Sequence, residues 1–339
     1  MKKLILLLII LFIEGCSNNE SSMAKYGFEN SKELSFNLLD LNESIYRPTG
    51  VEIFDSLLLI YDPVDKYNYA IYNINTLSLV IRGGEKGEGP DDIMYGQFVD
   101  KINNKEFQVS DLVNRKILIY NIDSIIKNRT FKPINKIFFS QYDTKGKGSI
   151  ETMYYLNDSV NIAIGPFTSG KYAYLNNNRI DYVGKYPDEL KSVGHPFYIH
   201  QGVLQINEKR NIILYHSPLG LYYEIYTYDD GINNKIGGDY VLTEFVNDCS
   251  TNNTMKGINS ADFADNEIFM LFSGKSDKES SNAIFADNIL VCDLNGTKKK
   301  CYKTNRSNLC ISLDALNRKI YCIAQNIENY EFEIGYYEY

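Results

Sequence analysis

The sequence predicts an all-β fold built from repeated four-stranded antiparallel units. Short runs rich in Ile, Leu, Val, Tyr and Phe recur along the chain, Asn, Asp and Gly punctuate them, and no convincing amphipathic helix separates them. Within the runs, apolar and polar residues roughly alternate, which is typical of strands in a half-buried sheet. We therefore expect one large β domain over residues 32–339.

An internal repeat indicates how these strands are arranged. The segment LLLIYDPVDKYNYAIYNINTL aligns with EFQVSDLVNRKILIYNIDSI: each has a strand ending in Asp, a polar turn and a strand ending in Tyr-Asn-Ile. A repeat of about 45 residues with four strands is the signature of a β-propeller blade. The last group of runs is one strand short, and KELSFNLLDL, residues 32–41, is an orphan strand. We expect it to complete the last blade, which gives a closed six-bladed β-propeller.

The glycine-rich stretch IRGGEKGEGPDDI, residues 81–93, is predicted to be a corner. It lacks the Gly-Lys-Ser/Thr of a phosphate-binding loop, and Pro90 follows where a helix would have to begin. Glycines allow the chain to turn from the outermost strand of the first blade to the innermost strand of the second.

GGEKGEGPDDI resembles the G-x-x-G-x-G-P-G-E-F loop between blades of six-bladed propellers related to the NHL and TolB-like groups, common among Bacteroidetes lipoproteins. Asp91, Asp92 and Ile93 replace the usual Gly-Glu-Phe. The resemblance implies the fold and a cell-surface setting. It implies no particular activity.

The N-terminus, MKKLILLLIILFIEGC, has the layout of a signal peptide over residues 1–15, and its ten apolar residues are too few to span a bilayer. The Gly before Cys16 resembles a bacterial lipobox, although Glu14 departs from it. This resemblance implies lipid on Cys16, with residues 16–31 as a flexible tether. We expect a lipid anchor in the outer membrane, facing the periplasm or the exterior; the alternative is a plainly secreted protein.

Composition restricts the partners. The chain carries a net charge of −8, and removal of residues 1–15 makes it one unit more negative, which argues against nucleic acid. The basic run at residues 298–300 is expected to be a solvated loop tip. We expect a monomer without cofactor. The cysteines form no C-x-x-C pair, which disfavours zinc and leaves any disulfide pairing open. Besides Cys16, the cysteines are Cys249, Cys292, Cys301, Cys310 and Cys322.

The candidate catalytic and metal-binding residues have simpler structural explanations. His195 and His200 in GHPFYIH could bind a metal at the propeller axis. Packing of these side chains on the surface or in the core is the simpler explanation. Asp262, Asp265 and Glu267 could hold calcium, although they read more simply as part of a turn. Nucleophile-elbow and Cys-His signatures are absent.

The expected binding site is the channel mouth, because the segments preceding the innermost strands converge there. Tyr46, Tyr95 and Tyr198 are predicted stacking surfaces, and Arg47 and Lys256 are predicted charge partners. The full predicted set is Tyr46, Arg47, Tyr95, Gln97, His195, Tyr198, His200, Lys256 and Asn259, with Glu151 and Asn308 as neighbours. The leading function is non-catalytic, cell-surface binding of a glycan, peptide or partner protein. The alternatives are a metal-dependent lyase or hydrolase with its site at the axis, and a structural scaffold subunit of an outer-membrane complex.

Overall fold

The computed structural model describes residues 23–28, 31–96, 98–176, 179–188, 197, 202–229, 231–241, 243, 245–246, 249–326 and 328–339. Structural statements below concern these residues.

Four separate sheets of four antiparallel strands account for the first two thirds of the fold. The first contains β3 (Gly50–Phe54), β4 (Leu57–Val64), β5 (Tyr67–Asn73) and β6 (Ser78–Glu85). The second contains β7 (Phe98–Lys101), β8 (Glu106–Asp111), β9 (Lys116–Asn121) and β10 (Asn135–Phe138). The third contains β11 (Thr152–Asn157), β12 (Val160–Ile164), β13 (Tyr172–Asn176) and β14 (Arg179–Val183). The fourth contains β15 (Val203–Asn207), β16 (Ile212–His216), β17 (Leu221–Tyr228) and β18 (Ile232–Val241). In each sheet the strands pair in chain order, as the repeat predicts.

The last third of the chain forms one eight-stranded sheet, because its central strand belongs to two successive units. Its strands are β21 (Ile258–Ala264), β22 (Glu267–Phe272), β23 (Ala286–Asp293), β24 (Lys298–Asp314), β25 (Lys319–Gln325), β26 (Phe332–Glu338), β1 (Ser31–Leu34) and β2 (Asn37–Leu38). The first half of β24 pairs with β23, where Cys301 lies opposite Leu290, and the second half pairs with β25, where Ile311 lies opposite Cys322. The chain thus passes from one four-stranded unit to the next without leaving the strand.

Helices contribute little. The longest described helix, α2 (Ile122–Asn128), connects β9 to β10, and the Asn121 side chain caps it by accepting the Ser124 N–H at 3.0 Å. The short helices are η1 (Ala24–Tyr26), η2 (Phe139–Gln141) and η4 (Glu208–Arg210), and β19 (Phe245–Val246) pairs with β20 (Cys249–Ser250). None of the described helices is long and apolar enough to cross a membrane.

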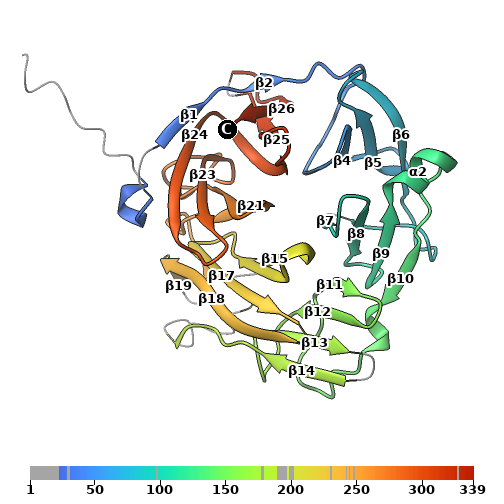
Figure 1. Ribbon diagram of the computed structural model, residues 1–339, viewed down its shortest axis with the longest axis vertical. Coiled ribbons are helices and arrows are strands. Elements are labelled where there is room, and N and C mark those ends of the chain that lie inside the picture. Colours follow the sequence, from blue (N-terminus) through green and yellow to red (C-terminus); the bar gives the residue numbers. More distant parts are fainter. Residues whose placement is uncertain are drawn as a thin grey trace, which may run out of the picture.

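The sheets are arranged radially around a common axis, with β7, β11, β15 and β21 nearest the centre and β10, β14 and β18 at the periphery (Figure 1). Four-stranded antiparallel sheets arranged in this way form a β-propeller. Tyrosine rings fill much of the space between neighbouring sheets: Tyr172 of β13 meets Tyr215 of β16 edge-on at 5.8 Å, and both rings are buried. The tyrosines of the aromatic runs therefore form part of the hydrophobic core, as the alternation of apolar and polar residues predicts.

The orphan strand differs from its prediction. In place of one strand over residues 32–41 there are two short ones. β1 runs parallel to the first half of β24, with Ser31 opposite Cys301, and β2 is antiparallel to β26, with Asn37 opposite Tyr336. Of the expected strand, only the part in β2 pairs with the last unit. The part in β1 lies along the first half of β24, at the edge of the preceding unit.

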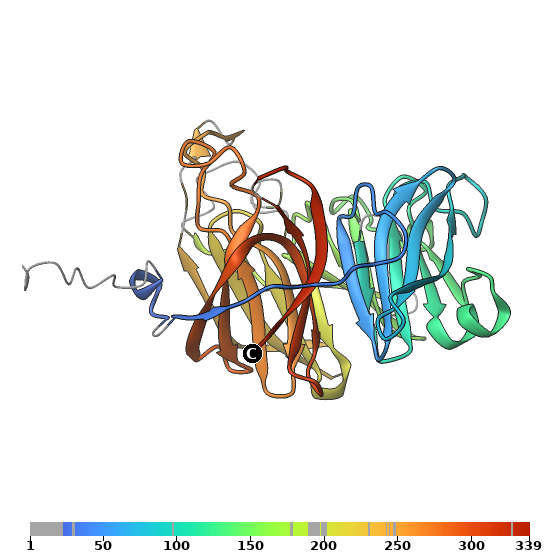
Figure 2. The same ribbon diagram turned by 90° about the horizontal axis from the view of Figure 1, so that it is seen from above.

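The expected tether over residues 16–31 also needs correction, because its described part is packed against the propeller. Met23, Tyr26 and Phe28 are buried in one core cluster with Phe272. The Tyr26 ring meets Phe272 edge-on at 5.4 Å, and the Lys298 ammonium donates to the Tyr26 carbonyl at 2.6 Å. Figure 2 shows this segment at the side of the molecule.

The glycine stretch is a corner, as predicted. Its first residues end the edge strand β6, the remainder leads towards β7, and no helix follows it. Gly84 has φ +69°, and a Cβ there would lie 2.7 Å from the Tyr69 ring, so both backbone and space require glycine. The Lys116 ammonium donates to the Gly89 carbonyl at 2.7 Å, and the Asp92 carboxylate accepts the Gly89 N–H at 3.0 Å. These bonds hold the corner against the second sheet.

The basic run at residues 298–300 is not a loop tip, because these lysines begin β24. Their ammonium groups pair with carboxylates on neighbouring strands. The pairs are Lys298 with Asp239 at 2.5 Å, Lys299 with Asp293 at 3.3 Å and Lys300 with Glu267 at 3.4 Å.

Candidate functional site

One face of the propeller carries the segments that lead into the first strand of each unit. The connections between second and third strands and the ends of the fourth strands lie on this face too, because the strands of each unit alternate in direction. We call it the mouth face. Hydrogen bonds join its loops from unit to unit: Asn114 donates to the Gly87 carbonyl at 3.0 Å, Arg115 to the Ile150 carbonyl at 2.8 Å, and the Gly257 N–H to the Pro218 carbonyl at 2.7 Å.

Exposed apolar side chains gather on the mouth face. Of twelve large apolar side chains exposed among the described residues, only Leu38, Ile134 and Leu316 lie elsewhere. The other nine are Tyr46, Met94, Tyr95, Val113, Phe138, Tyr240, Val241, Ile284 and Tyr330. Such clustering on one face is typical of an interaction surface.

Two of the predicted stacking residues, Tyr46 and Tyr95, are held in place by a device that repeats between units. In the first unit, the buried Asp62 accepts the N–H groups of Tyr46 and Arg47 at 3.0 and 2.8 Å, and Arg82 pairs with the same carboxylate at 3.3 Å. The backbone is fixed, while the Tyr46 side chain remains 63% exposed.

The second unit repeats this arrangement. Asp111, at the end of β8, accepts the N–H groups of Met94 and Tyr95 at 2.9 and 3.3 Å. Asp62 and Asp111 are the strand-ending aspartates of the sequence repeat, so the repeat marks two residues that hold loop backbone in place, which strand periodicity alone does not reveal. Each aspartate orders the loop that presents an exposed tyrosine.

Other predicted residues are engaged by the protein itself. Lys256 pairs with Asp277 at 2.8 Å, and the Asn259 amide donates to the Ile284 carbonyl. Glu151 accepts from the Ser149 hydroxyl at 2.7 Å. Arg47 is exposed, and no carboxylate in the described part of the chain pairs with it. Four predicted residues lie outside the described residues: Gln97, His195, Tyr198 and His200.

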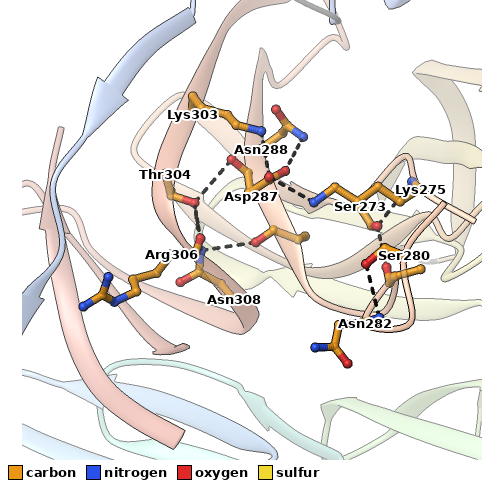
Figure 3. Close-up of polar contacts among 12 residues, drawn as sticks. Ser273, Lys275, Ser280, Asn282, Asp287, Asn288, Lys303, Thr304, Arg306 and Asn308 are labelled. Carbon is orange, nitrogen blue, oxygen red and sulfur yellow. Dashed lines mark hydrogen bonds and ion pairs between the residues drawn. The ribbon is translucent and has the colours of Figure 1, made fainter. Parts of the chain in front are cut away.

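Asn308 belongs to a buried network at the bend of β24 (Figure 3). Its amide donates to the Thr304 hydroxyl at 2.9 Å, and its carbonyl oxygen accepts from Tyr337 at 2.9 Å. Nearby, Asp287 lies between the ammonium groups of Lys275 at 3.0 Å and Lys303 at 2.7 Å. Burial raises the pKa of Asp287, but these two lysines outweigh it and hold the pKa below its usual range. The network holds the loop that carries Ile284 in place. Both the amide and the carbonyl oxygen of the Asn308 side chain are engaged in it.

The mouth face is hollowed between the second and third units. This pocket has a volume of about 380 Å³, within the range of small-molecule sites. The Arg115 guanidinium lies over the Phe139 ring, 5.4 Å from its centroid. The lining residues are Asn114, Arg115, Phe138, Phe139, Ser140, Tyr142, Thr144, Gly148, Ser149 and Ile150.

Carboxylates from the first strands meet near the axis. The Ser312 hydroxyl of β24 lies 2.8 Å from Glu52 of β3 and 3.5 Å from Asp262 of β21. Burial, with the Asp262 charge, raises the pKa of Glu52 well above its usual value, and burial also raises the pKa of Asp262. Next to them on β7, burial raises the pKa of Asp100 to about 7, although a hydrogen bond from Gln108 opposes it.

The residues weighed as calcium ligands do not gather. Asp262 lies on β21 near the axis, Asp265 lies in the turn, and Glu267 begins β22 and pairs with Lys300. Among the described residues, no group of three or more His, Cys, Asp or Glu side chains is placed to hold a metal ion. The described thiols, Cys292, Cys301, Cys310 and Cys322, are free. The Cys249 side chain lies outside the described part.

Sequence reasoning missed one charged cluster between the third and fourth units. Lys171 precedes β13, is fully buried, and donates to Glu224 of β17 and to the Tyr222 hydroxyl at 2.7 Å. Its ammonium lies 3.3 Å from the centroid of the Tyr215 ring. Burial lowers the pKa of Lys171 to about 7, and the Glu224 charge partly opposes this.

Glu224 is the other half of this cluster. Burial raises its pKa, but the charge and hydrogen bond of Lys171 outweigh that effect and hold the pKa below its usual value. The available signal was a single charge inside each aromatic run, in GKYAY and LYYEIYTY. A single charged residue within a run of buried apolar residues predicts that a group of opposite charge is buried beside it.

Comparisons with known proteins agree with the fold. No protein-family model matches the chain, and no curated protein matches its sequence. A member of the DUF4221 family from Bacteroides vulgatus superposes with a TM-score of 0.55 at 10% identity, covering 91% of this chain and 96% of that chain. A Bacteroides fragilis protein, named as a candidate exported protein, gives 0.53 at 15% identity, covering 90% and 94%. The β-propeller domain of Myceliophteria thermophila Cps50 gives 0.44 at 8% identity, covering 90% and 99%. At these identities the likeness to the two Bacteroides proteins shows the fold alone.

Proposed function

We propose that the protein is a non-catalytic binding lipoprotein whose mouth face recognises a glycan, peptide or partner protein outside the cytoplasm. The observation that carries this proposal is that nine of the twelve large apolar side chains exposed among the described residues lie on that face. Asp62 and Asp111 support it, because they order the loops presenting Tyr46 and Tyr95 before any ligand arrives. A pre-ordered surface loses less conformational entropy on binding.

We further propose that the units number six, with each half of β24 counted in a separate blade, and that β2 closes the ring on β26. The pairing of Asn37 with Tyr336 supports closure, because it joins the start of the domain to its end. The protein would then be a self-contained monomer.

The mouth-face proposal is tested with a triple variant, Tyr46→Ser, Tyr95→Ser and Tyr330→Ser. Purified glycans and peptides are first screened against the wild-type protein, and hits are measured by calorimetry. We expect the triple variant to weaken binding of a hit at least about tenfold, because stacking surfaces are lost. The matched control is Ile134→Ser with Leu316→Ser, away from the mouth face. Equal affinity in the triple variant and the wild type would exclude the mouth face as the site.

Lipidation at Cys16 is tested separately. The Cys16→Ala variant should leave the membrane fraction, appear in the soluble fraction and take up no labelled fatty acid, because the acyl chains supply the attachment. The Bacteroides fragilis protein of the same fold is named as a candidate exported protein, which agrees with a site outside the cytoplasm. A Cys16→Ala protein that stays in the membrane and is labelled would contradict the anchor.

An enzyme is the second candidate function, favoured by the carboxylates near the axis. A carboxylic acid with a pKa near 7, such as Asp100, can act as a general acid at neutral pH. Turnover of a mouth-face ligand that is lost in Asp100→Asn, with ligand affinity retained, would favour the enzyme over the binding protein. A scaffold role would instead be indicated by stable co-purification with outer-membrane proteins.

A further inference from the structure

The outer part of the propeller contains a second hollow, apart from the loops around the axis. It is a groove of about 430 Å³ between the end of β14 and the strands β17 and β18. Figure 1 places β14 and β18 at the periphery. The volume is in the range of small-molecule sites. The lining residues are Gly184, Lys185, Tyr186, Pro187, Glu224, Tyr226, Lys235 and Tyr240.

The carboxylate of Glu224 lies at the bottom of this groove, and hydrogen bonds hold it in place. Its side chain is only 3% exposed, and one carboxylate oxygen accepts from the buried Lys171 and from the Tyr226 hydroxyl at 2.9 Å. The other oxygen accepts from the Lys235 ammonium at 2.8 Å. Lys235 is 45% exposed, so a buried carboxylate holds a solvent-accessible ammonium in one place. This ordering lowers the entropy that Lys235 would lose on contacting a ligand.

The charges of the groove favour an anion. The single carboxylate of Glu224 is shared by the ammonium groups of Lys171 and Lys235, and Lys185 adds a third ammonium group, so positive charges outnumber negative ones at the groove. Lys185 is exposed, and no carboxylate of the described residues pairs with it. The nearby Asp239 is already paired with Lys298 at 2.5 Å. A cationic ligand would have to displace Lys235 and add a further positive charge, which costs electrostatic free energy.

We propose that this groove binds a ring compound carrying a carboxylate. The carboxylate lies between the ammonium groups of Lys185 and Lys235, where charge-assisted hydrogen bonds form. The ring packs against the tyrosine side chains of the walls, of which Tyr240 is 40% exposed. Two sources share this chemistry, an acidic sugar and an aromatic acid. The site lies at the outer rim of the mouth face, apart from the loops that carry Tyr46, Tyr95 and Tyr330, and goes beyond the proposed function.

The test uses galacturonate, galactose and benzoate, each titrated by calorimetry and by ligand-observed NMR at millimolar concentration and low salt. Galacturonate and galactose differ in the carboxylate, and benzoate carries the carboxylate on an aromatic ring. We expect at least one acid to bind and galactose not to bind. Binding of galacturonate alone identifies the acidic sugar, and binding of benzoate alone identifies the aromatic acid.

The decisive variant is Lys185→Gln with Lys235→Gln, which should weaken binding of the acid at least about tenfold, since two charge-assisted contacts are lost. The matched control is Lys127→Gln with Lys209→Gln, which removes the same charge from exposed lysines away from the groove. Thermal melting confirms that both variants are folded. Equal binding of galactose and galacturonate, unchanged binding in the groove variant, or no binding of either acid would overturn the proposal.

The groove proposal and the proposed function fail independently. The Tyr46→Ser, Tyr95→Ser and Tyr330→Ser protein should keep full affinity for the acid. Loss of that affinity in this triple variant, with the groove variant unaffected, would assign the acid to the surface around these three tyrosines and overturn the groove proposal.

Discussion

Replacing Lys171 by Met should lower the free energy of unfolding by about 3–5 kcal/mol. The cause is Glu224, whose side chain is 3% exposed and would be left as a buried carboxylate without its buried counter-charge. Tyr222 would also lose the donor to its hydroxyl. Urea denaturation at neutral pH measures the loss, and a fall of several degrees in the melting temperature should accompany it.

Two controls identify the cause of this loss. Lys235→Met removes a partner of the same carboxylate from an exposed position and should cost no more than about 1 kcal/mol. Adding Glu224→Gln to Lys171→Met removes the carboxylate that has lost its buried partner and should restore part of the stability. If Lys171→Met and Lys235→Met are equally stable, the buried pair does not have the role assigned to it.

Replacing Asp100 by Asn should stabilise the protein at pH 8 and have little effect at pH 4. An aspartate in an unfolded chain has a pKa of about 3.9, whereas burial raises the pKa of Asp100 in the folded protein to about 7. The folded state therefore binds the extra proton between these values, and the stability of the wild-type protein falls as the pH rises from about 4 to 7. Above pH 7 the cost approaches about 4 kcal/mol, and Asn does not incur it.

This prediction is measured as the difference in unfolding free energy between variant and wild type at pH 4, 6 and 8. Asn can still accept the hydrogen bond that Gln108 donates to Asp100 at 3.0 Å, so the contact is conserved. Asp123→Asn is a matched control, because Asp123 is exposed in α2. A difference that does not grow with pH would show that Asp100 is ionised at little cost in the folded protein.

Strand periodicity predicted the all-β class and the four-stranded units, because alternation and turn residues act locally. The same reasoning placed the glycine corner, since Gly84 needs a positive φ that sequence chemistry identifies. It could not split residues 32–41 into β1 and β2, because their partners in β24 and β26 are remote in sequence. Nor could it show that residues 23–28 pack, since Met23 and Phe28 stand singly in a polar stretch.

The candidate site was predicted in part for a similar reason. Tyr46 and Tyr95 could be placed before first strands, because loop position follows from strand order. Ion pairs such as Lys256 with Asp277 depend on loop conformation, which local patterns do not specify. Lys171 and Glu224 are 53 residues apart, and only the packing of two sheets brings them together.

The pairing of Asn37 with Tyr336 also sets an order of events during biosynthesis. These residues are 299 positions apart, so the first strands of the domain leave the ribosome and, for an exported chain, the translocation channel well before their partners exist. Until β24 and β26 follow, β1 and β2 carry unpaired backbone groups that invite wrong pairing. At ordinary synthesis rates of about 5–20 residues per second, that interval is on the order of tens of seconds. A chaperone that holds the N-terminal segment would act in this interval.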